Sequence, residues 1–353
     1  MKICILVLTN INKADGASRI RPLKLIDSFK KYHPNLEIYY LRERRHKPLK
    51  VVSKLIINNE KIDLCYIESQ TFPLSFREKL LIAILKLKGT KIFYFYRDMY
   101  WKFNIGRNSM SIFRWKKHYL KQLISLKFLE IFIDKLYVPT KTLIKYFPLK
   151  MQNNISDLPP AGDINNINYN PNDRFGALYV GGLSIRYGLK LMLEAFSKIN
   201  DNETIPLTII CRKDDYQNNK NYIKNYLSED WLIIKHLNNQ ELRPEFLKHK
   251  IGILPLEISD YNSLALPYKI FEYSSYGLPV FSSNNSESIK LINKHNIGIN
   301  IGGDADEFYE TIIKYYHDHN KLSLMSESCF KFINEEATWE HRHKKIINDY
   351  SKL

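Results

Sequence analysis

The sequence predicts an α/β protein made of two doubly wound domains that face a central cleft. The chain has 353 residues, which is too long for one ordinary core and long enough for two. Short apolar runs alternate with longer amphipathic ones, the pattern of βα units and parallel sheets. Residues 153–174 interrupt that pattern with Asn, Pro and Gly and so mark a domain boundary. Both domains are therefore expected to be Rossmann-like, with ligands at the carboxyl edges of their sheets.

The first domain is expected to span residues 1–165. One of its helices should run from Ser18 to Lys31, where apolar residues recur at helical spacing. The strands expected in this domain are Ile3–Leu8, Glu37–Leu41, Ile62–Ile67, Lys91–Tyr96 and Lys135–Val138.

The second domain is expected to span residues 166–337, and residues 338–353 should form a closing helix that packs back toward the first domain. Helical patterns include Leu189–Ile199, Gln240–His249 and Tyr268–Tyr276. The strands expected here are Ala177–Val180, Leu207–Cys211, Leu232–Ile234, Ile251–Pro255, Pro279–Ser282 and Gly298–Ile301.

The positive charge lies entirely in the first half. The whole chain has a formal charge of +16, and residues 1–165 hold 31 Lys and Arg against 13 Asp and Glu, whereas residues 166–353 hold 22 against 24. A basic domain beside a nearly neutral one suits an enzyme that rests on anionic lipid. General solubility of a lysine-rich protein is the alternative.

The four cysteines have no paired spacing, which fits a reducing compartment without zinc. The apolar run at the N-terminus is too short for a signal peptide, and no apolar stretch is long enough to span a bilayer. We therefore expect a cytoplasmic protein that binds peripherally to the inner face of the cell membrane.

The segment from Leu266 to Tyr273 carries the clearest chemistry. A strand, a long loop and then a helix opening after Pro267 would present unpaired N–H groups to a phosphate. Lys269 in the first turn adds a positive charge for a diphosphate, and Glu272 on the same face can accept hydrogen bonds from ribose hydroxyls. Alternatively, Glu272 is a capping acid and Lys269 a solvated surface residue.

This segment, with the turn Gly277-Leu278-Pro279-Val280, resembles the family 4 (group 1) glycosyltransferases of the GT-B architecture. Gly181-Gly182-Leu183 with Gly188 resembles the strand–loop–helix that opens the donor domain of that family, and Trp339-Glu340 resembles its closing element. The resemblance implies an enzyme that transfers a sugar from a nucleoside-diphosphate sugar and needs no metal or other cofactor.

Two departures from the family pattern affect the donor site. The usual Glu eight residues before the ribose acid falls on Leu264, next to Ser263, and both residues are placed at the donor by the resemblance. The Arg that commonly follows the first Gly of the donor loop is Gly182, and the usual Lys before the second Gly is Tyr187.

Three other basic residues could replace the missing positive charge at the diphosphate. Arg186 lies beside Tyr187 in the donor loop, and Arg212 and Lys213 follow the strand Leu207–Cys211.

In the first domain, Gly16 and Asp98 are the candidate site residues. Gly16 lies in the loop 12–19 after the first strand, where the family keeps a glycine-rich loop at the donor, although an ordinary turn needs a glycine equally. Asp98 ends the strand Lys91–Tyr96, and the resemblance places it near the transferred sugar or the acceptor hydroxyl. It would be a general base if the reaction inverts, or orient the sugar if it retains; otherwise it pairs with Arg97 or caps a turn.

Two further patterns have competing interpretations. Ile112–Phe132 and Phe76–Lys88 alternate Lys with large apolar residues, so each is either a membrane-surface helix or an ordinary amphipathic one. Asp304-Ala305-Asp306 matches an Asp-x-Asp metal motif, but helix capping explains it better, and we expect no metal site.

The sequence as a whole predicts a glycosyltransferase that acts on a glycan or lipid-linked acceptor in bacterial surface polysaccharide synthesis, with retention of configuration. The expected partners are a nucleoside-diphosphate sugar, the acceptor and an anionic membrane surface. Two alternatives are a catalytically silent glycosyltransferase-like partner subunit and a basic nucleic-acid-binding protein. The latter leaves the residues around Lys269 unexplained.

Overall fold

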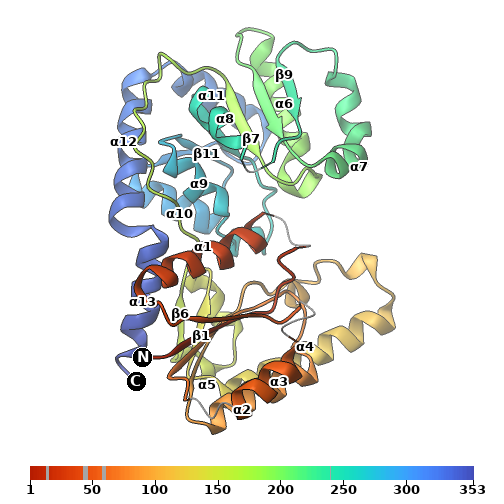
Figure 1. The fold of residues 1–353 in the computed structure, drawn as a ribbon. Coiled ribbons are helices and arrows are strands. Elements are labelled where there is room, and N and C mark those ends of the chain that lie inside the picture. Colours follow the sequence, from red (N-terminus) through yellow and green to blue (C-terminus); the bar gives the residue numbers. More distant parts are fainter. Residues whose placement is uncertain (13–15, 43–46, 58–60, 239) are drawn as a thin grey trace. The chain divides into compact units, whose positions relative to one another are not determined.

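The computed structural model describes residues 1–12, 16–42, 47–57, 61–238 and 240–353. The chain divides into two compact units (Figure 1). Unit 1 comprises Met1–Pro159 together with Trp339–Leu353, and unit 2 comprises Pro160–Thr338. The division after Pro159 falls inside the Asn- and Pro-rich stretch, six residues before the boundary expected from the sequence.

The described part of unit 1 contains a parallel sheet in the order β2-β1-β3-β4-β5-β6. Its strands are β1 (Ile3–Val7), β2 (Glu37–Tyr40), β3 (Leu64–Glu68), β4 (Lys91–Phe95), β5 (Lys135–Val138) and β6 (Ile155–Asp157). Its helices are α1 (Ala17–Tyr32), α2 (Pro48–Ile57), α3 (Phe76–Leu87), α4 (Ile112–Phe132), α5 (Leu149–Gln152) and α13 (Trp339–Tyr350), with 3₁₀ turns η2 (Tyr100–Phe103), η3 (Arg107–Ser109) and η4 (Lys141–Tyr146).

The C-terminal helix α13 packs against α1 within unit 1. The Nε2 atoms of His33 and His343 lie 3.0 Å apart, and the Tyr137 hydroxyl donates to Asp349 at 2.8 Å. Arg342 and Arg21 both donate to the carbonyl oxygen of Pro159, at 3.0 and 3.3 Å. These contacts hold a segment distant in sequence on the first unit.

The described part of unit 2 contains a parallel sheet in the order β12-β11-β10-β7-β8-β9. Its strands are β7 (Ala177–Val180), β8 (Leu207–Ile210), β9 (Leu232–Lys235), β10 (Ile251–Leu254), β11 (Val280–Ser282) and β12 (Gly298–Asn300). Its helices are α6 (Leu189–Asn200), α7 (Lys213–Ile223), α8 (Leu242–Lys248), α9 (Tyr268–Ser275), α10 (Ser286–His295), α11 (Ala305–Tyr316) and α12 (His319–Glu336), with 3₁₀ turns η5 (Ile185–Tyr187), η6 (Lys224–Tyr226) and η7 (Asn262–Leu264).

Both faces of the unit 2 sheet are buried because alternate strand residues point to opposite sides. Ala177 and Tyr179 join a cluster with residues of α6 and α11. Leu178 and Val180 join a second cluster with residues of α9 and α12. This is the layering of a doubly wound domain, and it confirms the α/β fold expected from the sequence.

Among the described residues, no helix has the length and apolar character needed to cross a membrane. The four cysteines are free and buried. Burial raises the pKa of the Cys329 thiol to about 12, which keeps this thiol protonated and unreactive near neutral pH.

Candidate active site

The carboxyl edge of the unit 2 sheet brings two loops together at a switch point. Since β7 lies between β10 and β8, the loops that follow β7 and β10 start side by side and run to α6 and α9. Gly188, with φ +78°, packs so closely that an added Cβ would lie 1.7 Å from the carbonyl oxygen of Pro255. The backbone N–H of Glu257 donates to the carbonyl oxygen of Arg186 at 3.1 Å. Ligands of doubly wound sheets bind at such points.

Arg186 lies between these two loops. Its guanidinium donates to the amide oxygen of Asn262 at 3.5 Å and lies 5.8 Å from the ring centroids of Tyr187 and Tyr261. Asn262 is buried, and its side-chain amide donates to the carbonyl oxygen of Glu257 at 2.8 Å. The structure thus brings this predicted cation to the η7 turn, which carries Ser263 and Leu264.

The η7 turn holds Leu264 in the interior. Leu264 is buried and its N–H donates to the carbonyl oxygen of Tyr261 at 3.0 Å, whereas Ser263 is partly exposed. Leu264 therefore places a buried apolar side chain at the position where the resemblance to family 4 glycosyltransferases implies a carboxylate.

Lys269 and Glu272 lie on one face of α9 and form an ion pair with each other. Their side chains are 20% and 13% exposed, and the Lys269 ammonium lies 6.0 Å from the Phe246 ring centroid. The alternative that Glu272 caps the helix does not hold, because the N-cap residue is Pro267 and no side chain caps this end. A diphosphate and a ribose at this face would compete with the ion pair for the two charged groups.

The helices α6 and α9 both begin without a side-chain cap and without an acid in the first turn. By contrast, the side chains of Ser75, Ser111 and Asp304 cap α3, α4 and α11. An uncapped helix end exposes N–H groups and a positive dipole to an anion. The two helices that start from the switch point therefore supply anion-binding ends at the same edge of the sheet.

The two departures from the family pattern in the donor loop are in contact with each other. A Cβ added to Gly182 would lie 2.9 Å from the Tyr187 ring, and the Tyr179 hydroxyl donates to the Gly182 carbonyl oxygen at 2.5 Å. A larger side chain at 182 would displace the Tyr187 ring. In this chain the glycine at 182 therefore leaves room for the Tyr187 ring.

Arg212 and Lys213 lie after β8, near the start of α7. The Arg212 guanidinium makes two hydrogen bonds to the Asp215 carboxylate, at 2.9 and 3.0 Å, and Lys213 is exposed. Asp215 thus holds the Arg212 guanidinium at the start of α7, whereas Arg186 lies between the two loops of the switch point.

In unit 1, Gly16 begins α1 with φ +54°, and its carbonyl oxygen accepts hydrogen bonds from Arg19 and Ile20 at 3.0 Å. Like α6 and α9, α1 has no side-chain cap and no acid in its first turn. Residues 13–15 of the predicted glycine loop lie outside the described residues.

Asp98 belongs to a polar cluster at the carboxyl ends of β3 and β4. Its Oδ2 accepts from the Thr71 hydroxyl at 2.9 Å and from Arg97 Nε at 3.3 Å, while Arg97 Nη2 donates to Thr71 at 2.6 Å. Asp98 is 8% exposed, and its buried Oδ1 has no hydrogen-bond partner among the described residues. The pairing with Arg97 considered from the sequence is present, and the second carboxylate oxygen is buried without a hydrogen-bond partner among the described residues.

The Asp-x-Asp sequence at residues 304–306 is a helix cap. The Asp304 carboxylate accepts from the backbone N–H groups of Asp306 and Glu307, at 3.0 and 2.9 Å. No cluster of three His, Cys, Asp or Glu side chains suited to a metal occurs among the described residues.

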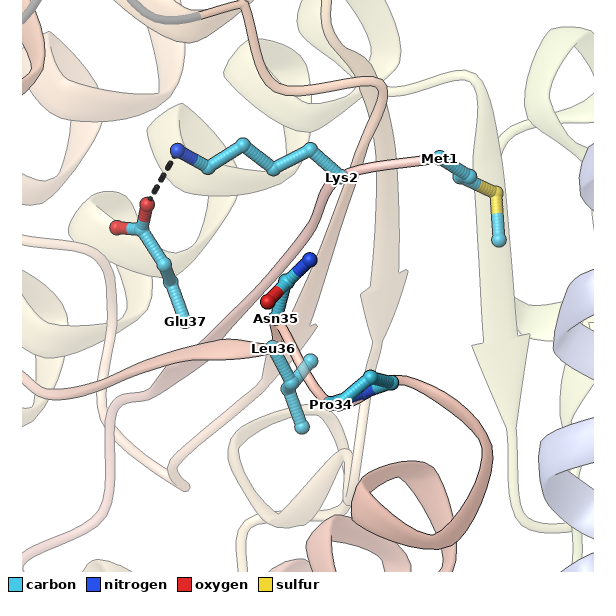
Figure 2. A pocket seen from close by; sticks show the side chains of 6 residues that line it. All are labelled: Met1, Lys2, Pro34, Asn35, Leu36 and Glu37. Carbon is cyan, nitrogen blue, oxygen red and sulfur yellow. Dashed lines mark ion pairs between the residues drawn. The ribbon is translucent and has the colours of Figure 1, made fainter.

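A separate hollow in unit 1 lies at the other edge of the sheet, where β1 and β2 begin (Figure 2). It is lined by Met1, Lys2 and residues 34–37, and the Lys2 ammonium pairs with Glu37 at 2.8 Å. Because Gly16 and Asp98 follow the carboxyl ends of their strands, this hollow does not include them.

Three polar or aromatic partners of the candidate residues were not predicted from the sequence: Thr71, Asn262 and Tyr261. Thr71 follows β3, and the other two lie in the loop after β10. Each of them follows a strand that lies next to the strand before its partner: β3 is next to β4, which precedes Asp98, and β10 is next to β7, which precedes Arg186. The sequence alone does not give this order of strands, so it could not show that these residues meet.

The comparisons with known proteins agree with this geometry. Residues 163–332, nearly all of unit 2, match the family described as glycosyl transferases group 1. Unit 2 is a group 1 glycosyltransferase domain. This match confirms the glycosyltransferase enzyme that the sequence predicted.

Solved structures of other glycosyltransferases share the fold over the whole chain. HepE of Anabaena in complex with UDP-glucose is 13% identical with a TM-score of 0.72, covering 100% of both chains. A UDP-forming α,α-trehalose-phosphate synthase from Burkholderia xenovorans is 10% identical with a TM-score of 0.64, covering 99% of this chain and 100% of the other. WaaG, a glycosyltransferase involved in lipopolysaccharide biosynthesis, is 12% identical with a TM-score of 0.62, covering 98% of each chain.

These similarities confirm the predicted GT-B fold of this glycosyltransferase. No curated protein sequence matches the chain.

Proposed function

We propose that this glycosyltransferase transfers a sugar, with retention of configuration, from a nucleoside-diphosphate sugar to a lipid-linked glycan in bacterial surface polysaccharide synthesis. The observation that carries the proposal is the meeting of two uncapped helix N-termini with Arg186 at the switch point of a group 1 domain. The complex of HepE with UDP-glucose and the role of WaaG in lipopolysaccharide biosynthesis support the donor class and the acceptor class.

At the donor, Glu272 would accept hydrogen bonds from the ribose and Lys269 would approach the diphosphate. Binding would then replace part of their mutual ion pair with contacts to the nucleotide. Arg186, with the ends of α6 and α9, would stabilise the negative charge that builds up on the leaving diphosphate. These groups supply the positive charge without a metal ion, so the proposal predicts that activity survives EDTA.

At the acceptor, the free Oδ1 of Asp98 would accept a hydrogen bond from a sugar hydroxyl. Thr71 and Arg97 hold the other oxygen of this carboxylate and so fix its orientation. Under retention Asp98 orients the sugar. If an NMR readout of the product anomer showed inversion, Asp98 would instead act as the general base.

A screen of nucleotide sugars, including UDP-glucose, tests the donor site. We expect one donor to raise the melting temperature of the wild-type protein and to be slowly hydrolysed by it. Glu272→Ala should abolish the shift, and Arg186→Ala should reduce hydrolysis by roughly a hundredfold, the usual effect of removing one group that stabilises developing charge.

Glu130→Ala is the matched control for this screen. Lys127 and Glu130 form an ion pair with the same order and spacing as Lys269 and Glu272, and Glu130 is 17% exposed. This variant should keep the full donor response. A donor response that survives Glu272→Ala would contradict the proposed site. If the protein responds to no donor but activates a co-expressed glycosyltransferase, it is a catalytically silent partner subunit.

The proposal also places the enzyme on the inner face of the cytoplasmic membrane, because a lipid-linked acceptor is presented there. Unit 1 holds 35 Lys and Arg against 14 Asp and Glu, whereas unit 2 holds 18 against 23. Anionic headgroups attract such a basic unit.

A further inference from the structure

The outward side of α4 is unusually apolar. Phe113 is 78% exposed, Ile112 66% and Ile131 62%. The inward side of the same helix is buried through Trp115, Leu126 and Leu129, so the outward apolar residues are not needed for the core. The large apolar side chains exposed on α4 are Ile112, Phe113, Tyr119, Leu120, Leu123, Ile124 and Ile131.

Lysines are interleaved with these residues. At 100° per residue, Lys116, Leu120, Leu123 and Lys127 lie on one stripe, and Lys117 lies beside Ile124. Lys116, Lys117 and Lys127 are all exposed. An outward face of alternating Lys and large apolar side chains matches the boundary between lipid headgroups and acyl chains.

Helix α3 extends this face, since it packs on α4 (Figure 1). Phe76 and Leu87, at its two ends, are 79% and 84% exposed. The Lys79 ammonium lies 5.9 Å from the ring centroid of Phe128 on α4, which links the two helices.

The net positive charge of α3 and α4 favours an anionic partner. Together the two helices hold eight Lys and Arg and two acids. Both acids are already paired, Glu78 with Arg42 at 3.1 Å and Glu130 with Lys127 at 3.1 Å.

We propose that the outward face of α3 and α4 docks on an anionic phospholipid bilayer. Phe113 and its apolar neighbours enter the boundary of the acyl chains, and the lysines contact headgroup phosphates. The inference deepens the proposed function and rests on it for the lipid-linked acceptor.

The inward side of α4 connects the docking face to the acceptor residues. The Gln122 side-chain amide donates to the carbonyl oxygen of Thr71 at 2.9 Å, and the Ser125 hydroxyl accepts from the N–H of Leu74 at 3.1 Å. Thr71 in turn donates to Asp98. The helix that lies on the membrane therefore also holds the loop that orients the candidate acceptor carboxylate.

Flotation of the full chain with lipid vesicles tests the docking face. Wild type should float with vesicles that contain phosphatidylglycerol and not with phosphatidylcholine alone. Lys116→Gln and Lys117→Gln should each lower the partition coefficient about fivefold. Phe113→Ser with Leu120→Ser should lower it at least tenfold. Leu324→Ser and Lys331→Gln, exposed positions on α12 of unit 2, are the matched controls and should change nothing.

Two further measurements separate the possible failures. Glu272→Ala should float normally, and Phe113→Ser/Leu120→Ser should keep wild-type donor hydrolysis in solution, since neither residue lies at the donor site. Loss of donor response with intact flotation would reject the proposed function alone.

The docking proposal is overturned if wild type does not float, or if the α4 variants float as well as wild type. It is also overturned if the apolar variant only converts a dimer to a monomer, or if the lysine variants lose RNA binding and keep vesicle binding.

Discussion

At the scale of single residues, Gly188 meets two requirements of the switch point. Its φ of +78° is in the left-handed region, and the carbonyl oxygen of Pro255 occupies the space that a Cβ would need. Gly89 has a similar φ of +82° but nothing within 4 Å of an added Cβ. Substitution of Gly89 therefore costs only the free energy of the backbone conformation, whereas substitution of Gly188 adds a steric clash with Pro255.

We predict that Gly89→Ala lowers the free energy of unfolding by about 1 kcal/mol, the cost of placing a non-glycine residue in this conformation. Gly188→Ala should cost at least about 2 kcal/mol more, because the chain around Pro255 must also move. It should weaken donor binding as well, since it displaces the start of α6. Urea denaturation of both variants measures the difference. Equal decreases in the free energy of unfolding would contradict the prediction, because they would show that the chain around Pro255 moves without an energetic cost.

The residues of the candidate site were only partly predictable from the sequence. Lys269 and Glu272 share a helix face because their spacing of three determines it, and Asp304 caps α11 because its residue type and position favour a cap. The contact of Tyr187 with Gly182, and that of Arg186 with Asn262, depend on how two loops meet. Such contacts have no signature in local sequence.

At the scale of elements, the strands were predicted to within one or two residues where apolar runs end in polar loops. β6 (Ile155–Asp157) was missed because it is short and lies inside the Asn- and Pro-rich stretch that was interpreted as linker. Its pairing with β5, and not its composition, makes it a strand.

The packing of α13 on α1 includes two histidines in direct contact, His33 and His343. With Nε2 atoms 3.0 Å apart, one ring must donate and the other accept, so protonation of both is excluded. His343 lies against the rings of Phe29 and Tyr32, and its burial, with the charge of His33, lowers its pKa to about 4. On the same helix, the charge of Glu340 raises the pKa of His343 and the charge of Lys344 lowers it further.

We predict that this pair makes unit 1 sensitive to acid. An unfolded histidine titrates near pH 6.5, so the stabilisation from neutral His343 is complete above that pH and is lost as the pH falls toward 4. The loss should be roughly 2 kcal/mol. His343→Phe should flatten the decline in melting temperature between pH 7 and about 4.5. His317→Gln, at an exposed histidine of unit 2, is the control; parallel curves for wild type and His343→Phe would contradict the prediction.

At the scale of the whole molecule, each unit has its own core, but unit 2 is built from one continuous segment of the chain and unit 1 from two. Unit 2 is one segment whose ends are joined by the hydrogen bond from the Gly162 N–H to the Ala337 carbonyl oxygen, at 2.8 Å. Unit 1 needs two segments, because α13 covers α1. All the donor residues proposed at the switch point belong to unit 2.

We therefore predict that residues 160–338, expressed alone, unfold in a single cooperative transition and are stabilised by the nucleotide of the preferred donor. At a concentration one hundred times the dissociation constant the stabilisation should be about 2.7 kcal/mol. Residues 1–159 should aggregate, since removal of α13 exposes Phe29, and a peptide of residues 339–353 should restore their solubility. Calorimetry with and without nucleotide, beside the Glu272→Ala fragment, measures these effects. A fragment that folds but binds no nucleotide, while the full chain does, would show that unit 1 supplies essential donor contacts, with the uncapped start of α1 at Gly16 as the first region to mutate.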